Sequence, residues 1–302
     1  MKAPPKKLYD LNKPLEQKTV IADTGDVGNR LDVFLKPLTP WRSRTRIREL
    51  FDEGRVTVNG VHRKPGYKMR NGDKVVLRFP PQDIREPVRE IPLDILYEDS
   101  DLIVLNKQPG VICHPVGKVL YNTLINALHK RYRNFEDPKK DVVPRLCHRL
   151  DKQTSGVLIV TKNEDVLYDL YFQFERRQVE KEYIALVEGR IEGEGGRIDL
   201  PIGQAVGSEI RIKRGIQQEG GLPSVTDYRV VQRFAHFTEV RAIPKTGRLH
   251  QIRVHLEAIG HPVVCDKLYG RCDKLFLSDL RPLAPGEEDR CLPAAKPFTA
   301  PA

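Results

Sequence analysis

One loop and the strand behind it constrain the fold of this chain more than any other feature. Residues 148 to 156 have the sequence His-Arg-Leu-Asp-Lys-Gln-Thr-Ser-Gly, and the apolar, β-branched run Val157 to Val160 follows directly. Such a run indicates a buried strand, so the loop would be mounted on a rigid core. Adjacent cations would keep Asp151 ionised. Taken alone, Asp151 is more typical of a turn or capping aspartate that pairs with its own neighbours.

Length and composition favour two compact units in a soluble protein. The chain has 302 residues, of which 39% are hydrophobic, which is enough for a sizeable core. Its five cysteines are scattered without a Cys-x-x-Cys pair, which predicts neither a disulfide framework nor a thiolate zinc site and indicates a reducing compartment. We find neither a signal-peptide core nor an apolar run of about 20 residues, and therefore expect a cytoplasmic protein without membrane association.

The positive charge of the chain is concentrated near its N-terminus. The net charge is +10, and residues 1 to 90 contain 20 Lys and Arg against 12 Asp and Glu, which leaves 31 against 29 for the remainder. A local excess of this kind is typical of a module that binds a polyanion, because neutralising phosphates releases counterions. A basic surface that serves solubility alone is the alternative.

Residues 1 to 20 are polar and rich in Lys and Pro, and we expect a mobile arm. Residues 21 to 82 then predict a small domain. One helix starts near Arg30, a second extends from an N-cap at Ser43 to Gly54, and strands surround the Asn59-Gly60 turn and recur at Val75 to Leu77. The arginines of this domain are expected to contact RNA, and the candidates are Arg30, Arg42, Arg44, Arg48 and Arg55.

A proline-rich linker at residues 83 to 92 leads to a larger domain at 93 to 280, and a Pro- and Ala-rich tail at 281 to 302 is expected to be disordered. In the larger domain, strands joined by tight turns outnumber helices. The predicted fold class is α+β, with a small α/β RNA-binding domain followed by a mixed, largely antiparallel sheet with flanking helices. Strands are expected at Ile95–Tyr97, Leu102–Leu105, Val157–Val160, Glu182–Val187, Ser224–Gln232 and Phe237–Ile243. Helices are expected at 124–128 (capped by Asn122), 166–174 and 250–259.

Several motifs occur together in the larger domain. Besides the Asp151 loop, Lys181 to Gly189 has the pattern K-x-Y-x-A-x-V-x-G, and Lys245 to His255 contains T-G-R-x-H-Q-x-R-x-H. Gly260-His261-Pro262 and Asp266-x-x-Tyr269-Gly270 follow. Together with Lys107 and His114-Pro115, these residues resemble the RluA-type pseudouridine synthases over residues 95 to 270. Residues 28 to 80 are similar to a small RNA-binding fold found in a ribosomal protein and in tyrosyl-tRNA synthetases.

The resemblance implies conversion of uridine to pseudouridine in RNA, without a cofactor. Asp151 would then act as a nucleophile that attacks the ribose anomeric carbon or carbon 6 of uracil. Alternatively, it would act as a general base that removes a ribose proton to form a glycal. Arg253 is expected to hold Asp151 charged, and Tyr183 to stack on the base and assist proton transfer at carbon 5. Without the flanking motifs, Tyr183 would be an ordinary core residue. Substrate-binding roles are expected for Arg149, Arg248, His250, Lys107 and His114.

The nucleotide would have to be flipped out of the RNA to be reached. Ribosomal RNA of the large subunit is the expected partner, with transfer RNA as the alternative, and we expect a monomer. His250 and His255 lack the H-E-x-x-H pattern of a zinc site, and Lys245-Thr246-Gly247 lacks a preceding phosphate loop, so neither metal nor ATP is expected. Competing functions are a non-catalytic RNA-binding protein and, because no second carboxylate accompanies Asp151, less plausibly a glycoside hydrolase. Gln108 and Cys265 depart from the resembled pattern and put only local loop geometry in doubt.

Overall fold

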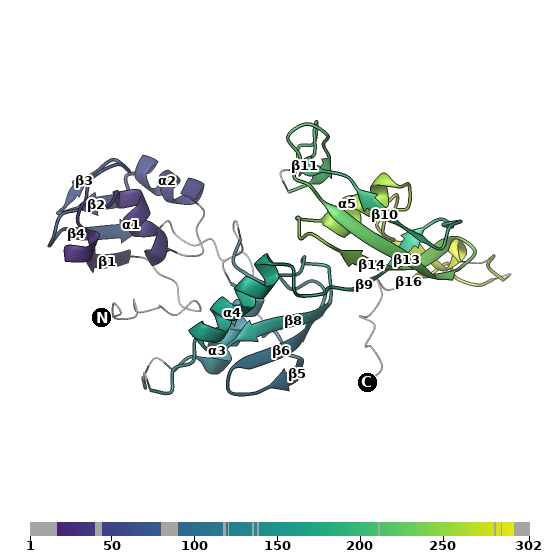
Figure 1. Cartoon of the computed structure of the whole chain (residues 1–302), viewed down its shortest axis with the longest axis horizontal. Coiled ribbons are helices and arrows are strands. Elements are labelled where there is room, and N and C mark those ends of the chain that lie inside the picture. The colour runs from purple at the N-terminus through teal and green to yellow at the C-terminus, as the bar shows by residue number, and fades with distance from the viewer. Residues whose placement is uncertain are drawn as a thin grey trace. The chain divides into compact units, whose positions relative to one another are not determined.

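The computed structural model describes residues 17–39, 44–79, 90–116, 119, 121–134, 136–137, 139–210, 212–280, 282–284 and 286–292. The chain divides into two compact units, residues 1–167 and 168–302, and Figure 1 shows that each contains sheets with helices beside them. The first unit holds a small N-terminal domain and a further four-stranded sheet, and the second unit holds another four-stranded sheet and smaller two-stranded ones. The predicted α+β class is confirmed. No helix within the described ranges combines the length and the hydropathy needed to cross a membrane.

The N-terminal domain packs two helices on an antiparallel sheet of four strands in the order β1-β4-β2-β3. Its core takes Leu31, Phe34 and Leu35 from the first helix, at the spacing of one helical face. The elements are β1 (Gln17–Ile21), α1 (Leu31–Leu38), α2 (Arg44–Asp52), β2 (Val56–Val58), β3 (Val61–His62) and β4 (Lys74–Arg78). One expectation is corrected, because β1 pairs with β4 from Gln17 onward and residues 17–20 therefore belong to the domain and not to the arm.

The second sheet of the first unit places the Asp151 motif. It has the order β5-β6-β8-β7, with all neighbours antiparallel. Its elements are β5 (Ile95–Glu98), β6 (Leu102–Lys107), α3 (Leu124–Tyr132), β7 (Arg145–Leu146), β8 (Gly156–Thr161) and α4 (Glu164–Glu175). The expected buried strand is confirmed, since Leu158 and Val160 on β8 are both 0% exposed and pack with Ile103 and Leu105 of β6.

The helix α3 begins at Leu124 as expected, but its N-cap is one residue later than the expected Asn122. Its N-cap is Thr123, whose backbone N–H and hydroxyl both reach Asn126 Oδ1. Asn122 adopts a positive φ of 59° just before the cap. The short polar side chain of Asn122 tolerates that left-handed conformation, which explains why an asparagine stands there without being the cap.

The second unit is built on an antiparallel sheet in the order β10-β13-β14-β9, against which α5 packs. Val187, Val240 and Leu256 form its core and are 0% exposed. The elements are β9 (Tyr183–Glu188), β10 (Gly195–Asp199), β11 (Ile202–Gln204), β12 (Arg214–Ile216), β13 (Val225–Arg233), β14 (Phe237–Pro244), α5 (Gln251–Ala258), β15 (Leu275–Phe276) and β16 (Cys291–Leu292).

Two expectations about the second unit are corrected. The strands β10, β11 and β12 were not anticipated, because their sequences are rich in Gly and charge and show little apolar alternation. The residues expected to form a disordered tail contain β16, which pairs with β15 through Cys291 and Phe276. The final residues of that tail, 293–302, lie outside the described part of the chain.

Candidate active site

Asp151 lies in the loop that joins β7 to β8. The start of this loop is tied to β8, because the backbone N–H of Ile159 donates to His148 Nε2 at 3.0 Å and the N–H of Cys147 donates to Ile159 O at 3.3 Å. The loop closes with a turn in which the N–H of Thr154 donates to Asp151 O at 3.1 Å. Asp151 itself is only partly exposed. These hydrogen bonds tie the loop that carries Asp151 to a core strand, as the sequence predicts.

The segment from Gly110 to Cys113 donates hydrogen bonds to backbone carbonyls of this loop. That segment follows β6, which pairs with β8 in a register that sets Lys107 opposite Gly156. Gly110 donates its N–H to Lys152 O at 2.7 Å, and Cys113 donates its thiol to Leu150 O at 3.4 Å. The loop around Asp151 is therefore braced from both flanks by backbone-directed hydrogen bonds.

Lys107 completes this brace from inside the protein. Its residue exposure is 2%, and its ammonium donates to Gln108 O at 3.0 Å, Lys152 O at 3.3 Å and Thr154 O at 2.7 Å. An ammonium has three N–H donors, and these three carbonyls match them. Lys107 thus holds the loop, which corrects the expectation that it binds substrate directly.

The electrostatic surroundings of Lys107 connect it to the loop as well. Desolvation by burial lowers the pKa of the ammonium, and the negative charge of Asp151 opposes that shift. Burial also raises the pKa of the Cys113 thiol, which keeps it in the neutral form that donates to Leu150 O. The cation beneath the loop therefore interacts favourably with the carboxylate that the loop carries.

His114 and Arg149 lie at the surface of the first unit, as expected for groups that meet RNA. The pKa of His114 lies below its usual value, chiefly because the protein around it desolvates the ring and also because Arg149 is positively charged. His114 is therefore biased towards its neutral form, and Arg149 supplies the positive charge of the pair. Their contact with substrate stays a prediction.

Tyr183 and Arg253 belong to the second unit. Tyr183 opens β9, is half-buried and is paired with Ala242 of β14. Arg253 projects from α5, where its guanidinium binds Asp266 through Nε–Oδ2 at 2.5 Å and Nη2–Oδ1 at 2.8 Å. The same guanidinium lies 4.9 Å from the centre of the Tyr269 ring. Bidentate pairing together with cation–π stacking fixes the plane of an arginine.

Asp266, the partner of Arg253, is well satisfied. Burial tends to raise the pKa of its carboxyl, but hydrogen bonds from Arg253 and from the backbone N–H groups of Leu268 and Tyr269 outweigh burial, and the pKa lies below its ordinary value. The Asp266 carboxylate is thus ionised and rigid. The ion pair expected between Arg253 and Asp151 stays a prediction.

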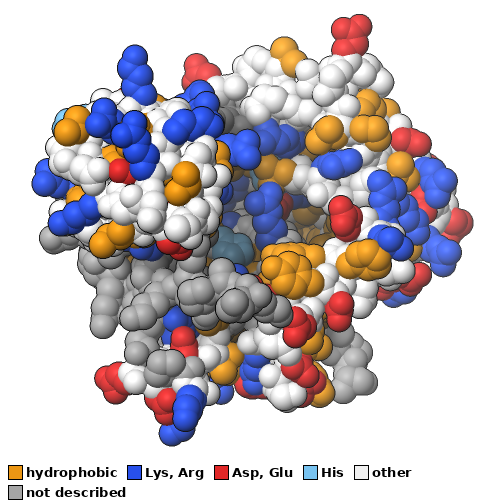
Figure 2. All heavy atoms as spheres, turned by 60° about the vertical axis from the view of Figure 1, so that its left-hand side comes forward, with side chains coloured by type: hydrophobic (Ala, Val, Ile, Leu, Met, Phe, Trp, Pro, Cys, Tyr) orange, Lys and Arg blue, Asp and Glu red, His pale blue; other side chains and the backbone are white. Residues whose placement is uncertain are grey.

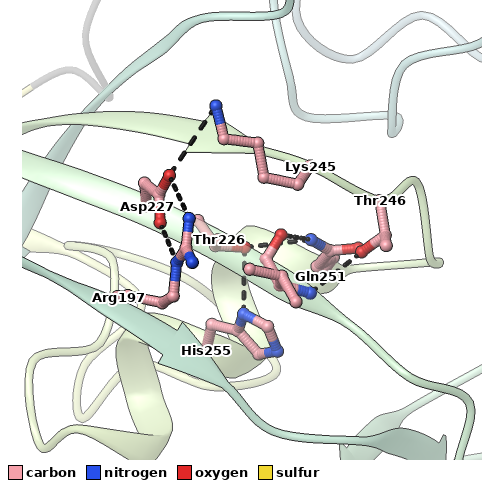
Figure 3. A network of polar contacts seen from close by, with 8 residues as sticks. Arg197, Thr226, Asp227, Lys245, Thr246, Gln251 and His255 are labelled. Atoms are coloured by element: carbon pink, nitrogen blue, oxygen red, sulfur yellow. Dashed lines mark hydrogen bonds and ion pairs between the residues drawn. The ribbon is translucent and has the colours of Figure 1, made fainter. Parts of the chain in front are cut away.

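A chain of buried polar groups joins the start of α5 to the sheet (Figure 3). Gln251 Oε1 accepts from Thr246 Oγ1 at 2.6 Å and from the N–H of Arg248 at 3.0 Å, and its Nε2 donates to Thr226 Oγ1 at 2.9 Å. His255 lies on the other side of Thr226, with Nδ1 at 2.9 Å from Oγ1 and Nε2 at 3.0 Å from Leu200 O.

The partners of His255 define its protonation state. A carbonyl can only accept, so Nε2 carries the proton and Nδ1 accepts from Thr226. Burial lowers the pKa of His255, which agrees with this neutral form. His255 is therefore a structural group that joins α5 to the sheet. Within the described part of the chain, no group of three or more His, Cys, Asp and Glu side chains is arranged to hold a metal.

His250 and Arg248 occupy the turn before α5. His250 has a left-handed backbone with φ 59° and is buried, and its Nδ1 lies 2.8 Å from Tyr269 Oη. Its ring meets that of Tyr269 edge to face at 82°. Arg248 is partly exposed and donates from Nε to Pro223 O at 3.3 Å. Of the two, Arg248 is the better placed to meet substrate, while His250 packs against Tyr269.

The expected RNA-binding arginines fall into two groups. Arg44 and Arg48 lie one helical turn apart on α2, are exposed and have no ion-pair or hydrogen-bond partner among the described side chains. Arg30 is instead paired with Asp32 at 2.9 Å, and Arg55 is paired with Glu53. Arg42 lies outside the described residues. In the view of Figure 2, Lys and Arg side chains gather over the N-terminal domain, in the upper left.

The fold and these sites define a class of protein. The model of the RNA pseudouridylate synthase family matches residues 101–258, more than half of the chain, and the model of the S4 domain matches residues 29–75. The chain therefore belongs to the RNA pseudouridylate synthase family and carries an N-terminal S4 domain. It is an enzyme of that family, an isomerase that acts on uridine in RNA.

Named relatives and one solved structure are similar to this chain. An uncharacterized RNA pseudouridine synthase of Aquifex aeolicus is 38% identical over 80% of this chain and 77% of its own length. The ribosomal large subunit pseudouridine synthase D of Yersinia pestis is 40% identical over 81% of this chain and 74% of its own length. The structure of human RNA pseudouridylate synthase domain containing 1 has 31% identity, covers 69% of this chain and 86% of that one, and aligns with a TM-score of 0.50.

Sequence reasoning missed the residues that hold the candidate catalytic groups in place. Gly110, Cys113 and Asp266 act through backbone or side-chain partners that lie far from them in the sequence. The motif Asp266-x-x-Tyr269 stood among the recognised patterns, but its spacing gave no sign that both side chains contact Arg253. These roles depend on contacts between separate motifs, which a single sequence does not show.

Proposed function

We propose that this enzyme isomerises one or more uridines in large-subunit ribosomal RNA. Two observations support the choice of substrate. Relatives at 36–40% identity, from Yersinia pestis, Vibrio parahaemolyticus and Xylella fastidiosa, are named ribosomal large subunit pseudouridine synthase D. In addition, the S4 domain presents Arg44 and Arg48 as exposed cations for a polyanion.

In the proposed reaction, the bond between ribose C1′ and uracil N1 breaks and a bond between C1′ and C5 forms. The proton on C5 is lost to water and N1 gains one, so no oxidant or reductant is needed. The Asp151 carboxylate starts the reaction as nucleophile or as base. The observation that carries this assignment is the bracing of its loop by Lys107, Gly110 and Cys113, since a reacting carboxylate must be held in place through bond cleavage.

Tyr183 and Arg253 act with Asp151 in this proposal. Arg253, oriented by Asp266, supplies the positive charge that pairs with the Asp151 carboxylate. Tyr183 stacks on the uracil and takes part in removing the C5 proton. Arg149 and Arg248 are assigned to the backbone of the flipped nucleotide, with His114 beside Arg149.

The experiment compares three RNAs, each labelled with tritium at carbon 5 of uridine. Purified enzyme is incubated separately with large-subunit ribosomal RNA, small-subunit ribosomal RNA and transfer RNA, and release of tritium to water is measured. We expect release from the large-subunit RNA to exceed that from the other two by at least about tenfold at equal uridine content. Preferential release from transfer RNA would overturn the substrate assignment. Binding of all three without any release would favour a non-catalytic RNA-binding protein.

That the enzyme works as a monomer in the cytoplasm stays a prediction. Light scattering of the purified protein, alone and with RNA, checks the first part, and fractionation of cells that express the tagged chain checks the second. A mass corresponding to two chains in both conditions would contradict the monomer.

A further inference from the structure

Lys181 is a half-buried cation that has no counter-charge among the residues that the structure describes. It lies two residues before Tyr183 and was not among the expected site residues. Among the residues that the structure describes, its ammonium has neither a hydrogen-bond nor an ion-pair partner. The adjacent Glu182 is directed elsewhere, because its carboxylate pairs with Arg241 at 3.3 Å. An ammonium that is partly desolvated and unpaired is unfavourable unless a ligand supplies the anion.

A second cation stands close enough to Lys181 to act on it. Burial lowers the pKa of the Lys181 ammonium, and the charge of Arg177 lowers it further. Arg177 is exposed and has a positive φ of 59°, at the position after α4 where the N–H groups of Arg177 and Gln178 donate to Phe174 O and Gln173 O. Glycine is the favoured residue in such a helix-ending conformation. A long basic side chain at that position increases the repulsion that an anion would relieve.

The side chain of Lys181 lies on the same side of the sheet as Tyr183. Along β9, Tyr183, Ala185 and Val187 are wholly or partly buried, whereas Ile184 is exposed. Carrying this alternation back along the chain assigns Glu182 to the outer side with its partner Arg241 and Lys181 to the side of Tyr183. The ammonium therefore stands beside the tyrosine that the proposed function brings to the base.

The same ammonium reaches the turn that carries Arg248. A Cβ built on Gly247 would lie 3.6 Å from Lys181 Nζ, so the ammonium sits directly against the backbone of that glycine. Gly247 has no side chain, so the Lys181 ammonium can approach the backbone of this turn closely. Lys181 therefore joins the segment before Tyr183 to the turn that carries Arg248, and Arg177 adds positive charge to its surroundings.

We propose that Lys181 binds the phosphate that flanks the target uridine, and so anchors the RNA backbone alongside Tyr183. This inference rests on the proposed function and names a contact within it. A phosphodiester fits because it is the one group that carries a full negative charge at every nucleotide, whatever the base, and a lysine ammonium binds it as a point charge. Lys181 is therefore assigned a role in binding RNA and not in the chemical step.

The test is a thermodynamic cycle on the full-length enzyme. The variants are Lys181→Gln and Lys181→Arg, with Lys274→Gln as the matched control because Lys274 is exposed in the same unit and has no described partner. The RNA is a fragment containing the modified uridine, made either with normal linkages or with neutral methylphosphonates on both sides of that uridine. Dissociation constants and single-turnover rates are measured for each combination.

We expect Lys181→Gln to weaken binding of the normal RNA about tenfold and to reduce the salt slope of log K by about one. The single-turnover rate at saturating RNA should change less than about threefold. The methylphosphonate RNA should bind Lys181→Gln and wild type about equally, Lys181→Arg should retain most of the affinity, and Lys274→Gln should resemble wild type. Removing the repulsion with Arg177 should also leave the melting temperature unchanged or slightly higher.

An equal loss on neutralising the phosphates in wild type and in Lys181→Gln would overturn the proposal, as would a lowered melting temperature with normal binding. Failure of the proposed function would look different. In that case the wild type itself would release no tritium from the fragment, before any variant is compared.

Discussion

The loop of Asp151 and the helix α5 hold two proposed catalytic side chains by opposite means. Around Asp151 the protein holds the main chain, because Lys107, Gly110 and Cys113 all donate to loop carbonyls. Around Arg253 it holds side chains, through Asp266 and the ring of Tyr269. A main-chain brace fixes where a loop lies and leaves its carboxylate to react, whereas a side-chain brace fixes the orientation of one charged group. We infer that Asp151 needs placement and Arg253 needs orientation.

The largest expected effect on stability comes from the main-chain brace. Lys107→Met keeps the length of the side chain but removes the donors to three buried carbonyls. We expect a loss of about 2–4 kcal/mol in the free energy of unfolding, since each unsatisfied buried polar group costs about 1–3 kcal/mol. Urea unfolding followed by circular dichroism measures it, with Lys152→Met as the exposed lysine control from the same loop. A loss no greater than that of the control would show that Lys107 does not brace the loop.

The side-chain brace should respond to pH in a way that the loop does not. Asp266→Asn removes a buried carboxylate whose pKa is below its ordinary value, and we expect a loss of about 1–3 kcal/mol at pH 7. The stabilising contribution of a carboxyl with a lowered pKa is present above the unfolded-state value of about 3.9 and is lost as the pH falls through the folded-state value. The difference between wild type and Asp266→Asn should therefore shrink below about pH 4.

Unfolding at pH 7 and pH 3.5 tests this second prediction, with Asp273→Asn as an exposed aspartate control. Single-turnover rates at pH 7 should also fall for Asp266→Asn, because Arg253 loses its orientation. If the stability difference were the same at both pH values, the Asp266 carboxylate would not be the group that holds Arg253.

The smallest expected effect on stability comes from substitutions in the S4 domain. These substitutions test RNA binding without changing the contacts that hold Asp151 or Arg253. Arg44→Gln combined with Arg48→Gln removes two exposed cations without described partners, so stability should change by less than about 0.5 kcal/mol. RNA affinity should fall for all sequences alike, and the salt slope of log K should drop by about two. Arg46→Gln is the control, because Arg46 is already paired with Glu49 at 2.7 Å. An unchanged salt slope would remove α2 from RNA binding.

The sequence predicted the fold where apolar spacing was strong. The buried strand β8, the helix α5 and the helices of the S4 domain were anticipated because their core residues recur at regular intervals. The strand β1 was missed, since it is a polar strand whose place is set by pairing with β4. The strands β10 to β12 were missed for the same reason, because sheet pairing can recruit glycine-rich and charged segments that carry no pattern of their own.

The motifs nominated the candidate catalytic groups, but they did not reveal the residues that support those groups. Asp151, Tyr183 and Arg253 stand in motifs and remain the proposed catalytic residues. Lys107 was expected to meet substrate, yet it is buried against three carbonyls, a contact that depends on the register between β6 and β8. Lys181 stood in a recognised motif, but only the absence of a described partner in the structure draws attention to it. The contacts that support a side chain and the charges around it arise only in the folded chain. The spacing of residues along the sequence does not predict them.

The central claim is that the Asp151 carboxylate carries out the chemical step, and Asp151→Asn tests it most directly. This substitution keeps the shape of the side chain and removes its negative charge, and Asp165→Asn on the exposed side of α4 is the matched control. Tritium release is measured from RNA labelled at carbon 5 of uridine, in a single turnover with enzyme in excess. The account predicts that Asp151→Asn binds RNA like wild type but releases tritium about 10³-fold more slowly or not at all, while Asp165→Asn retains the wild-type rate. Release by Asp151→Asn within a few-fold of the wild-type rate would contradict it.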